Sequence, residues 1–433
     1  MAKNKKRNGA DPAVEDPARS ASVLVILALL VALGPLSTDA YVPGLPRLAE
    51  DLDSSASRVQ LTVTACLVGL AVGQLVAGPM SDALGRRRPL LFGLAGYAAA
   101  GFSCALAPNA EILVLLRGLQ GASGAFALVI AYAYVRDLHT GRAAARYFSL
   151  LLLVTGLAPI VAPLAGAQIL RQSGWREIFV ALAALSVVVF VVCLIALPES
   201  HPAHRRRPGG LRAAGSVYGR LLRDRILMGY ALANALVFAA MFVYISGSPF
   251  VLQQIYGLSP QQYSVVFAMN ALGLVAAAQA NGRAVRRVGA RPLLGCGVIG
   301  SASGSVALLV LALTGAGLWP VLAALFVVIT SVGLVLPNTP ALALENHGAH
   351  AGAAAALLGC GQFLFGGLAA PLAGVHGPGD VTPMAAVMAA LTAAAAVTLA
   401  VLARPPAAHR RRRSGAGAPA LHEPPKPAHH LPR

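Results

Sequence analysis

The sequence predicts an all-α integral membrane protein whose twelve transmembrane helices form two pseudo-symmetric bundles of six. Of the 433 residues, 57% are hydrophobic and only 12% are charged, whereas soluble domains carry roughly 25% charged residues. The apolar residues lie in runs of about 20, the length that an α-helix needs to cross roughly 30 Å of hydrocarbon. The basic residues gather on one side of these runs.

Twelve apolar runs are long enough to span a membrane. The first follows a basic stretch, as a signal peptide would, but it is long and eleven more follow, so we interpret it as a retained first helix. The expected spans are residues 22–43, 59–81, 89–108, 111–135, 147–170, 175–197, 227–250, 262–284, 292–314, 318–341, 351–374 and 382–403.

The basic residues predict the orientation of the chain. If the N-terminus is cytoplasmic, 29 of the 34 Lys and Arg lie on the cytoplasmic side, four lie outside and Arg117 lies within a helix. This asymmetry is the positive-inside pattern. We therefore expect both termini to be cytoplasmic. The net charge of +18 then reflects topology, and we expect no nucleic-acid partner.

The apolar runs divide six and six around a polar segment. Residues 198–226 contain seven arginines and are interpreted as a cytoplasmic linker between an N-terminal bundle, 22–197, and a C-terminal bundle, 227–403. Residues 1–21 and 404–433 hold too little apolar material to fold, so both are expected to be disordered cytoplasmic tails. The basic second tail suits contact with anionic lipid, although a solvated tail is the simpler interpretation.

A weak internal repeat indicates that the two halves are related. The pattern Gly-x-x-x-(Asp or Arg)-x-x-Gly-x-Arg occurs at Gly78–Arg87 and again at Gly282–Arg291, after the second helix of each half. Parallel repeats of six helices, with a substrate site near the membrane midplane, are one known transporter architecture.

The residue types exclude several kinds of chemistry. A P-loop requires a lysine beside the nucleotide phosphates, and the lysines here are confined to the tails, so a gradient or a separate subunit must drive any transport. The pair His347 and His350 lacks a third ligand nearby, so we expect no metal. The five cysteines lie in apolar spans and are interpreted as small core residues. We expect no cofactor and no enzymatic activity.

Two ionisable residues lie clearly within a span, Asp39 in the first and Arg117 in the fourth. Charged groups inside a bilayer are costly and mark functional sites. Both are expected roughly 6 to 9 Å below the outer surface, where they would share one polar cavity and form a possible ion pair. Such an acid can exchange a proton or a cationic drug; the alternative is a static pair that sets helix packing.

Three segments resemble motifs of the major facilitator superfamily. They are the cytoplasmic-loop motif Gly78-x-x-x-Asp82-x-x-Gly85-x-Arg87, the proton-coupling motif Leu113-x-x-x-Arg117-x-x-Gln120-Gly121, and a variant of the antiporter motif, Gly156-Leu-Ala-Pro159-Ile-Val-Ala-Pro163-Leu-Ala-Gly166. In the last, Ala158 stands where many antiporters have Gly.

Further segments are similar to Bcr/CflA-type drug/proton antiporters. They are Ser37-Thr-Asp39-Ala-Tyr41-Val-Pro43, Val135-Arg136-Asp137-Leu138, Trp175-Arg176 and Tyr244-Ile-Ser246-Gly-Ser248-Pro249-Phe250. The resemblance covers residues 22–403. It implies a multi-pass protein of the bacterial inner membrane that exports drug-like molecules, such as bicyclomycin, chloramphenicol or sulfonamides, in exchange for protons. The expected partners are these molecules, protons and membrane lipid, with the chain as a monomer. Val31 leaves one acid in the first helix where some relatives carry two.

The motifs also have physical interpretations. Gly78, Asp82, Gly85 and Arg87 are expected to form a conformational latch through carboxylate, guanidinium and helix dipoles; the alternative is a topological anchor. Proline removes a backbone donor and permits a bend, so the segment from Gly156 through Pro159 and Pro163 to Gly166 is expected to act as a gate, or alternatively as a passive kink.

Neutral polar and aromatic residues within the spans are candidates for contact with substrate, although each also suits hydrogen bonding between helices. The candidates are Tyr41, Gln120, Tyr244, Ser246, Asn270, Asn338 and Gln362.

Two other functions use the same scaffold, because a fold does not determine a function. One is a facilitator or proton-coupled importer of a small metabolite, and the other is a membrane receptor without a transport cycle. The retained Asp39 and Arg117 argue against the receptor. The direction of transport separates an importer from an exporter.

Overall fold

Long helices account for nearly all of the structure. The computed structural model describes residues 17–139, 141–206, 218–345, 351–374 and 380–403, which contain helices and no strand. The long helices are α1 (Pro17–Asp39), α3 (Ala56–Leu84), α4 (Arg87–Ala105), α5 (Ala110–Leu138), α6 (Gly141–Gln172), α7 (Trp175–Ala196), α9 (Arg225–Phe250), α10 (Pro260–Val288), α11 (Ala290–Leu313), α12 (Leu318–Leu344), α13 (Ala351–Ala369) and α14 (Thr382–Val401).

Each of the twelve predicted spans coincides with one of these helices. In the described part of the chain, eleven stretches are long and apolar enough to cross a membrane. Helix α4 is not among them, because it is only 19 residues long and begins with two arginines, Arg87 and Arg88. The all-helical membrane fold predicted from composition is thus the fold observed.

The first span is longer than predicted. Helix α1 ends at Asp39, and the chain continues through a short 3-10 turn, η1 (Val42–Gly44), into helix α2 (Leu45–Asp51). The apolar stretch therefore runs to Asp51 instead of ending at residue 43. The proline after Val42 fits the new helical turn, since proline is tolerated at the start of a helix. Asp39 consequently lies in the last turn of α1.

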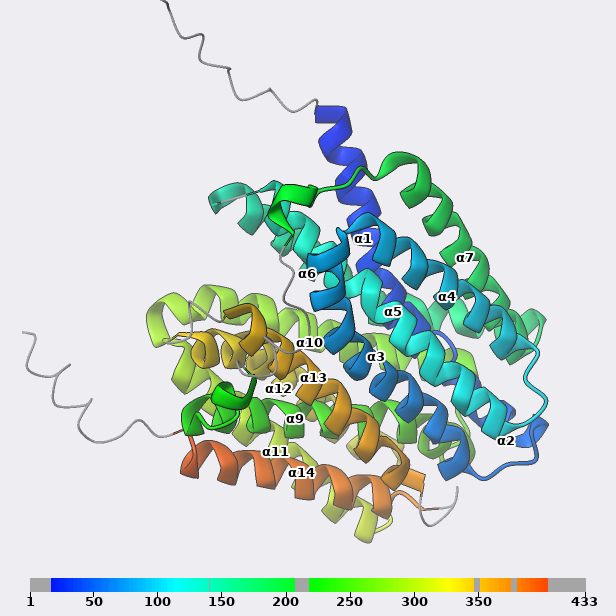
Figure 1. Cartoon of the computed structure of the whole chain (residues 1–433). Coiled ribbons are helices and arrows are strands. Elements are labelled where there is room, and N and C mark those ends of the chain that lie inside the picture. The colour runs from blue at the N-terminus through cyan, green and yellow to red at the C-terminus, as the bar shows by residue number, and fades with distance from the viewer. Residues whose placement is uncertain (1–16, 140, 207–217, 346–350, 375–379, 404–433) are drawn as a thin grey trace, which may run out of the picture.

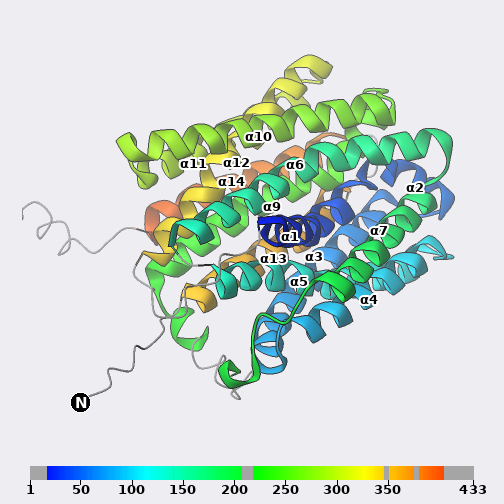
Figure 2. The ribbon, with the colours of Figure 1, turned by 90° about the horizontal axis from the view of Figure 1, so that it is seen from above.

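The helices form two groups (Figure 1). Helices α1 to α7 pack against one another, chiefly through the pairs α3 with α5, α4 with α5 and α4 with α7. Helices α9 to α14 form the second group, chiefly through α11 with α12, α9 with α14 and α9 with α13. We call these groups the N-half and the C-half. The halves meet along two seams, α3 against α13 and α6 against α10; Figure 2 shows α6 and α10 side by side.

The internal repeat noticed in the sequence has a structural counterpart. Helices α3 and α10 are both 29 residues long, and their first residues, Ala56 and Pro260, are 204 positions apart, the same offset as between the two sequence motifs. Each begins at a serine whose side chain accepts a backbone hydrogen bond, and each ends at a glycine with a φ near 90°, Gly85 and Gly289. Only glycine adopts this backbone conformation readily, which explains why the motif repeats its second glycine.

The hydrogen bonds seen between described residues of the two halves gather at one end. Among the described residues, six side-chain hydrogen bonds cross between the halves. They involve the beginnings of α3 and α10, the ends of α6, α9 and α13, and the turns that follow α1, α9 and α13. All of these lie at the end of the bundles away from the chain termini. We call this end the far end and the opposite one the near end.

Some sequence predictions were wrong in detail. Residues 17–21, assigned to the disordered tail, belong to α1. Cys296, interpreted as a core residue, is exposed, and Cys360 is half-buried; Cys66, Cys104 and Cys193 are buried as expected. The pair His347 and His350, residues 1–16 and 404–433, and linker residues 207–217 lie outside the described residues.

Candidate functional site

Asp39 is a buried acid at the end of α1. Its side chain is 4% exposed, and its Oδ1 atom has no hydrogen-bond partner among the described residues. The segment that follows it contacts the C-half: η1 packs against α9 and α10, and the Gln253 side chain donates a 3.0 Å hydrogen bond to the carbonyl of Pro43. Asp39 therefore lies in the N-half, next to the far-end contact between the halves.

Arg117 of α5 is fully buried without a carboxylate partner among the described residues. Its Nη1 donates to Ser37 Oγ at 2.8 Å and to Gln120 Oε1 at 2.6 Å, and its Nη2 donates to the Ser37 carbonyl at 3.1 Å. That carbonyl is in the last turn of α1, where the helix dipole is negative. The guanidinium also lies 4.7 Å from the ring centroid of Tyr41 and 5.6 Å from that of Phe179.

The ion pair suggested for Asp39 and Arg117 is absent. None of the ion pairs among the described residues includes either group. The two side chains are instead linked through α1, because Ser37, which holds Arg117, lies two residues before Asp39. The α1 C-terminus replaces the carboxylate as the group that stabilises the buried cation, which sequence spacing could not indicate.

Gly166 of the antiporter-like motif packs directly against the segment that carries Asp39. A Cβ atom at position 166 would overlap the carbonyl oxygen of Ala40. The motif also touches the C-half: the Pro163 carbonyl accepts a 3.0 Å hydrogen bond from Ser264 Oγ, and a Cβ at Gly156 would lie 3.2 Å from Val275. Helix α6 remains continuous through Pro159, which is half-buried, and Pro163. The motif thus lies between Asp39 and the C-half.

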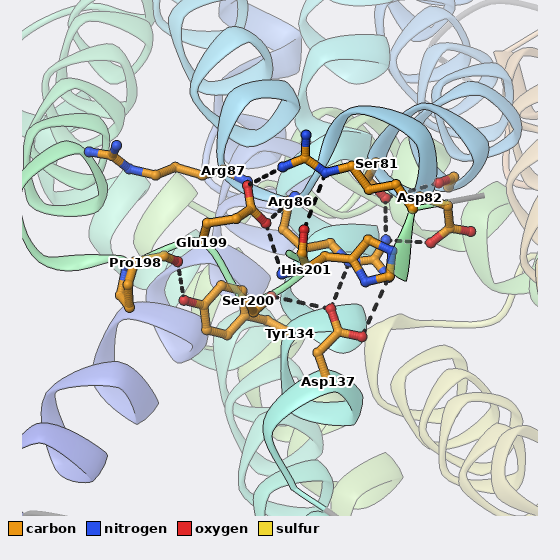
Figure 3. A network of polar contacts seen from close by, with 12 residues as sticks. Ser81, Asp82, Arg86, Arg87, Tyr134, Asp137, Pro198, Glu199, Ser200 and His201 are labelled. Carbon is orange, nitrogen blue, oxygen red and sulfur yellow. Dashed lines mark hydrogen bonds and ion pairs between the residues drawn. The ribbon is translucent and has the colours of Figure 1, made fainter. Parts of the chain in front are cut away.

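The loop motif is organised around Arg86 instead of the predicted Arg87 (Figure 3). Arg86 is 3% exposed and donates to Asp82 at 2.5 Å, to Asp137 at 2.8 Å and to Ser81 at 2.7 Å. Burial alone would lower the pKa of Arg86, but the hydrogen bonds to Asp137 and Asp82 raise this pKa above its usual value. Arg86 therefore remains a cation.

Glu199, which follows α7, connects the linker to this network. Its carboxylate accepts from the backbone N–H of Arg86 at 2.7 Å and of Arg87 at 3.2 Å, at the N-terminus of α4. Ser200 donates to Asp137 at 3.2 Å, and Tyr134 donates to the Pro198 carbonyl. We call Ser81, Asp82, Arg86, Tyr134, Asp137, Glu199 and Ser200 the Arg86 network.

Arg87 and Arg291, the last residues of the two repeated motifs, have roles that are equivalent to each other and differ from that of Arg86. Arg87 donates to the Leu194 carbonyl at 2.5 Å, near the end of α7, and Arg291 donates to the Ala403 carbonyl at 3.0 Å, just after α14. Each therefore stabilises the C-terminus of the sixth helix of its own half. Among the described residues, the side-chain hydrogen bonds of Asp82, Arg86 and Arg87 stay within the N-half and the linker, so these bonds do not form the predicted latch between the halves.

Comparison with known proteins identifies the family of this chain. Residues 27–370 and 230–430 match the model of the Major Facilitator Superfamily. The chain belongs to the Major Facilitator Superfamily. It is 40% identical over 365 residues, 84% of this chain and 90% of the relative, to the uncharacterized MFS-type transporter YdgK of Bacillus subtilis. It is 29% identical over 367 residues, 85% of this chain and 92% of the relative, to a bicyclomycin resistance protein homolog of Haemophilus influenzae.

The fold also matches solved structures of this superfamily. The crystal structure of a D-xylose-proton symporter superposes with a TM-score of 0.72 at 16% identity, covering 89% of this chain and 98% of the other. This Major Facilitator Superfamily chain is thus a multi-pass membrane transporter and not an enzyme. The resemblance to Bcr/CflA-type drug antiporters is confirmed by relatives named for bicyclomycin, chloramphenicol and multidrug resistance.

The residues proposed to contact substrate fall into separate places in this superfamily fold. Tyr41 and Gln120 surround Arg117 in the N-half. Tyr244 accepts a 2.8 Å hydrogen bond from Asn270 in the C-half, and Ser246 donates to the Ala370 carbonyl.

Asn338 lies apart from the other candidates. Its side-chain amide exchanges hydrogen bonds of 2.6 and 3.4 Å with that of Asn281. Both residues lie in the parts of α12 and α10 that approach the near end of the bundles. Gln362 is half-buried on α13. Gly78 has nothing within 4 Å of an added Cβ, so close packing does not explain that glycine here. Their roles in transport stay predictions.

The sequence did not single out Ser37, Arg86 or Glu199 from their neighbours. Ser37 looks like an ordinary helix serine until the fold places it beside Arg117. Arg86 is one of three consecutive arginines, and only its burial distinguishes it from Arg88, which is exposed. Glu199 is one of two acids, with Asp224, in a linker that holds seven arginines, and this contrast is a signal that the sequence offers.

Proposed function

We propose that this chain is a proton-coupled secondary transporter that exports small drug-like molecules across the bacterial inner membrane by alternating access, with both termini cytoplasmic. The observation that carries the proposal is Asp39, a buried acid beside the contact between the halves with one oxygen unpartnered among the described residues. The relative named for bicyclomycin resistance supports a drug-like substrate.

The hydrogen bonds between the halves support alternating access. If the termini are cytoplasmic, the far end faces outward, and the six bonds between the halves close it. The halves then rock as the units 22–197 and 227–403 on either side of the linker 198–226. Breaking six single bonds of about 1 kcal/mol each is within reach of a transport cycle.

Asp39 suits the exchange of one proton. An ionised carboxylate that is buried without a partner is costly, so the side chain fits the far-end-closed state when it carries a proton. Opening either end brings water to it and permits release or uptake. Arg117 fixes the end of α1 through Ser37, and so holds Asp39 in position without neutralising it.

Everted membrane vesicles test the proposal. A susceptibility panel in an efflux-deficient host, including bicyclomycin, chloramphenicol and a sulfonamide, first selects the compound whose inhibitory concentration rises most. An imposed pH gradient should then drive uptake of that compound by wild type, and Asp39→Asn should abolish it. Glu111→Gln is the control, because Glu111 is an exposed acid paired only with Arg58 among the described residues, and it should transport normally. Gradient-driven uptake by Asp39→Asn would refute the role of Asp39.

A further inference from the structure

A cavity at the far end has walls from both halves. Its volume is about 430 Å³, within the range that small ligands fill. The N-half contributes the turn between α2 and α3, with the acids Glu50 and Asp53. The C-half contributes Phe250 and Gln254, where α9 passes into the π-helical turn η3 (Val251–Ile255). A ligand in this cavity therefore touches both halves at once.

The cavity is complete because the far end is closed. Gln253, next to the cavity residue Gln254, donates a 3.0 Å hydrogen bond to the Pro43 carbonyl of the N-half. The N-half wall is held by its own backbone, since the N–H of Ser54 donates to the Ala49 carbonyl at 2.9 Å. Opening the far end moves the two walls apart. Only the closed state thus offers the whole cavity.

The N-half wall of the cavity carries negative charge. Glu50 and Asp53 are exposed acids, and neither forms an ion pair among the described residues. None of the described residues that line the cavity is basic. Asp51, between the two acids in the sequence, is instead engaged by α7, where Trp175 Nε1 donates to its carboxylate at 3.0 Å. Two carboxylates without a cation therefore border one small space.

Two further features of the cavity suit a ligand that has a charged group on an apolar body. Ser54 lines the cavity, and its Oγ atom is buried without a hydrogen-bond partner among the described residues. A buried hydroxyl without a partner is unfavourable, whereas the hydroxyl of the adjacent Ser55 accepts from the backbone N–H of Arg58 at 3.3 Å. Phe250 is only 4% exposed and supplies an aromatic wall, a surface that attracts organic cations.

We propose that this cavity is an outer binding site for a small organic ammonium ion, and that its occupation holds the far end closed. The ammonium N–H groups donate to the carboxylates of Glu50 and Asp53 as charge-assisted hydrogen bonds, and the apolar part of the ion packs against Phe250. A calcium ion fits less well, because calcium takes about six to eight oxygen ligands and the cavity supplies two acids.

The regulatory consequence of this site rests on the proposed function, whereas binding itself does not. A ligand that binds only one of two states shifts the population toward that state. If the far end faces outward, an ammonium compound that accumulates outside stabilises the closed state and slows further export. Export then becomes sensitive to the external concentration of cationic compounds.

Isothermal titration calorimetry of the purified full chain with benzylammonium tests the binding. Wild type should bind, and the double variant Glu50→Gln with Asp53→Asn should bind at least about tenfold more weakly, because both charge-assisted bonds are lost. Asparagine tolerates the positive φ of 44° at position 53, so the turn is kept. Asp51→Asn is the matched control. It removes an equal charge outside the cavity and should change the affinity less than about twofold.

Two measurements test the contribution of the C-half. Phe250→Leu should weaken benzylammonium binding about threefold, because the aromatic face is lost. Spin labels at Glu111→Cys and Leu313→Cys, exposed positions at the far end and outside the cavity, report the distance between the halves in a cysteine-free background. Saturating benzylammonium should lower the ratio of long to short distances at least about threefold.

Several results would overturn the site. They are no binding to wild type, an unchanged affinity in the double variant, or an equal loss in Asp51→Asn, because the ion then senses only the general charge of the surface. Displacement of benzylammonium by an equal concentration of calcium would assign the cavity to a metal ion instead. Unchanged distances, or unchanged binding by Phe250→Leu, would overturn the bridge between the halves. The proposed function fails on a different result, gradient-driven uptake by Asp39→Asn in vesicles, which involves neither benzylammonium nor this cavity.

Discussion

Gly166 of α6 packs directly against the carbonyl oxygen of Ala40. An added Cβ would overlap that oxygen, which belongs to the residue after Asp39. Backbone on both sides must move to accommodate the change. We expect Gly166→Ala to displace the end of α1 and lower gradient-driven transport at least tenfold, measured as initial uptake into everted vesicles.

The control for this prediction is Gly34→Ala, on α1 itself. No atom lies within 4 Å of a Cβ at position 34, and alanine favours a helix by roughly 0.5 to 1 kcal/mol over glycine. This variant should transport like wild type with unchanged or higher thermal stability. Equal transport by both variants would show that the contact between α6 and Ala40 is not needed.

The three consecutive arginines should respond differently to substitution. Arg86→Ala leaves Asp137, only 13% exposed, without its guanidinium, and breaking a largely buried pair costs about 3 kcal/mol. Arg87→Ala removes one hydrogen bond to α7, about 1 kcal/mol. Arg88→Ala should be neutral because Arg88 is exposed. Thermal unfolding of the purified variants should follow this order, and a larger effect at Arg87 than at Arg86 would contradict it.

Thr64→Val should shift the halves toward the far-end-open state. Thr64 Oγ1 donates a 2.7 Å hydrogen bond to the Gly367 carbonyl in the other half. Losing about 1 kcal/mol changes the ratio of open to closed molecules about fivefold. Spin labels at Arg58→Cys and Gln254→Cys in a cysteine-free background should report a larger long-distance population.

Thr155→Val is the matched control for Thr64→Val. Its hydroxyl donates to the Leu151 carbonyl within α6, so no contact between halves is lost. The distance distribution should not change. An equal shift in both variants would mean that the substitution acts on helix stability and not on the seam.

Two buried asparagines should have opposite effects on stability. Asn234 is fully buried with neither amide atom partnered among the described residues, whereas Asn338 bonds reciprocally with Asn281. Asn234→Leu should therefore raise the free energy of unfolding by about 1 kcal/mol, and Asn338→Leu should lower it by about as much. Thermal denaturation in detergent measures both. A destabilised Asn234→Leu would indicate a partner such as an ordered water.

The local sequence determined the membrane fold and the position of its helices. Apolar runs of about 20 residues leave an α-helix as the only way to satisfy backbone groups in lipid, so each predicted span became a helix. The sequence also revealed the repeated glycines Gly85 and Gly289, because a positive φ after the helix favours glycine in each half.

Only the tertiary structure decided how the charged groups are satisfied. Asp39 and Arg117 were found from the cost of charge in a membrane, but their expected pairing was wrong, because Arg117 binds the end of α1 through Ser37. The choice of Arg86 over Arg87 likewise depends on Asp137, 51 positions later. Hydrogen bonds between distant segments depend on the direction in which each side chain points. The spacing of residues along one helix does not reveal that direction.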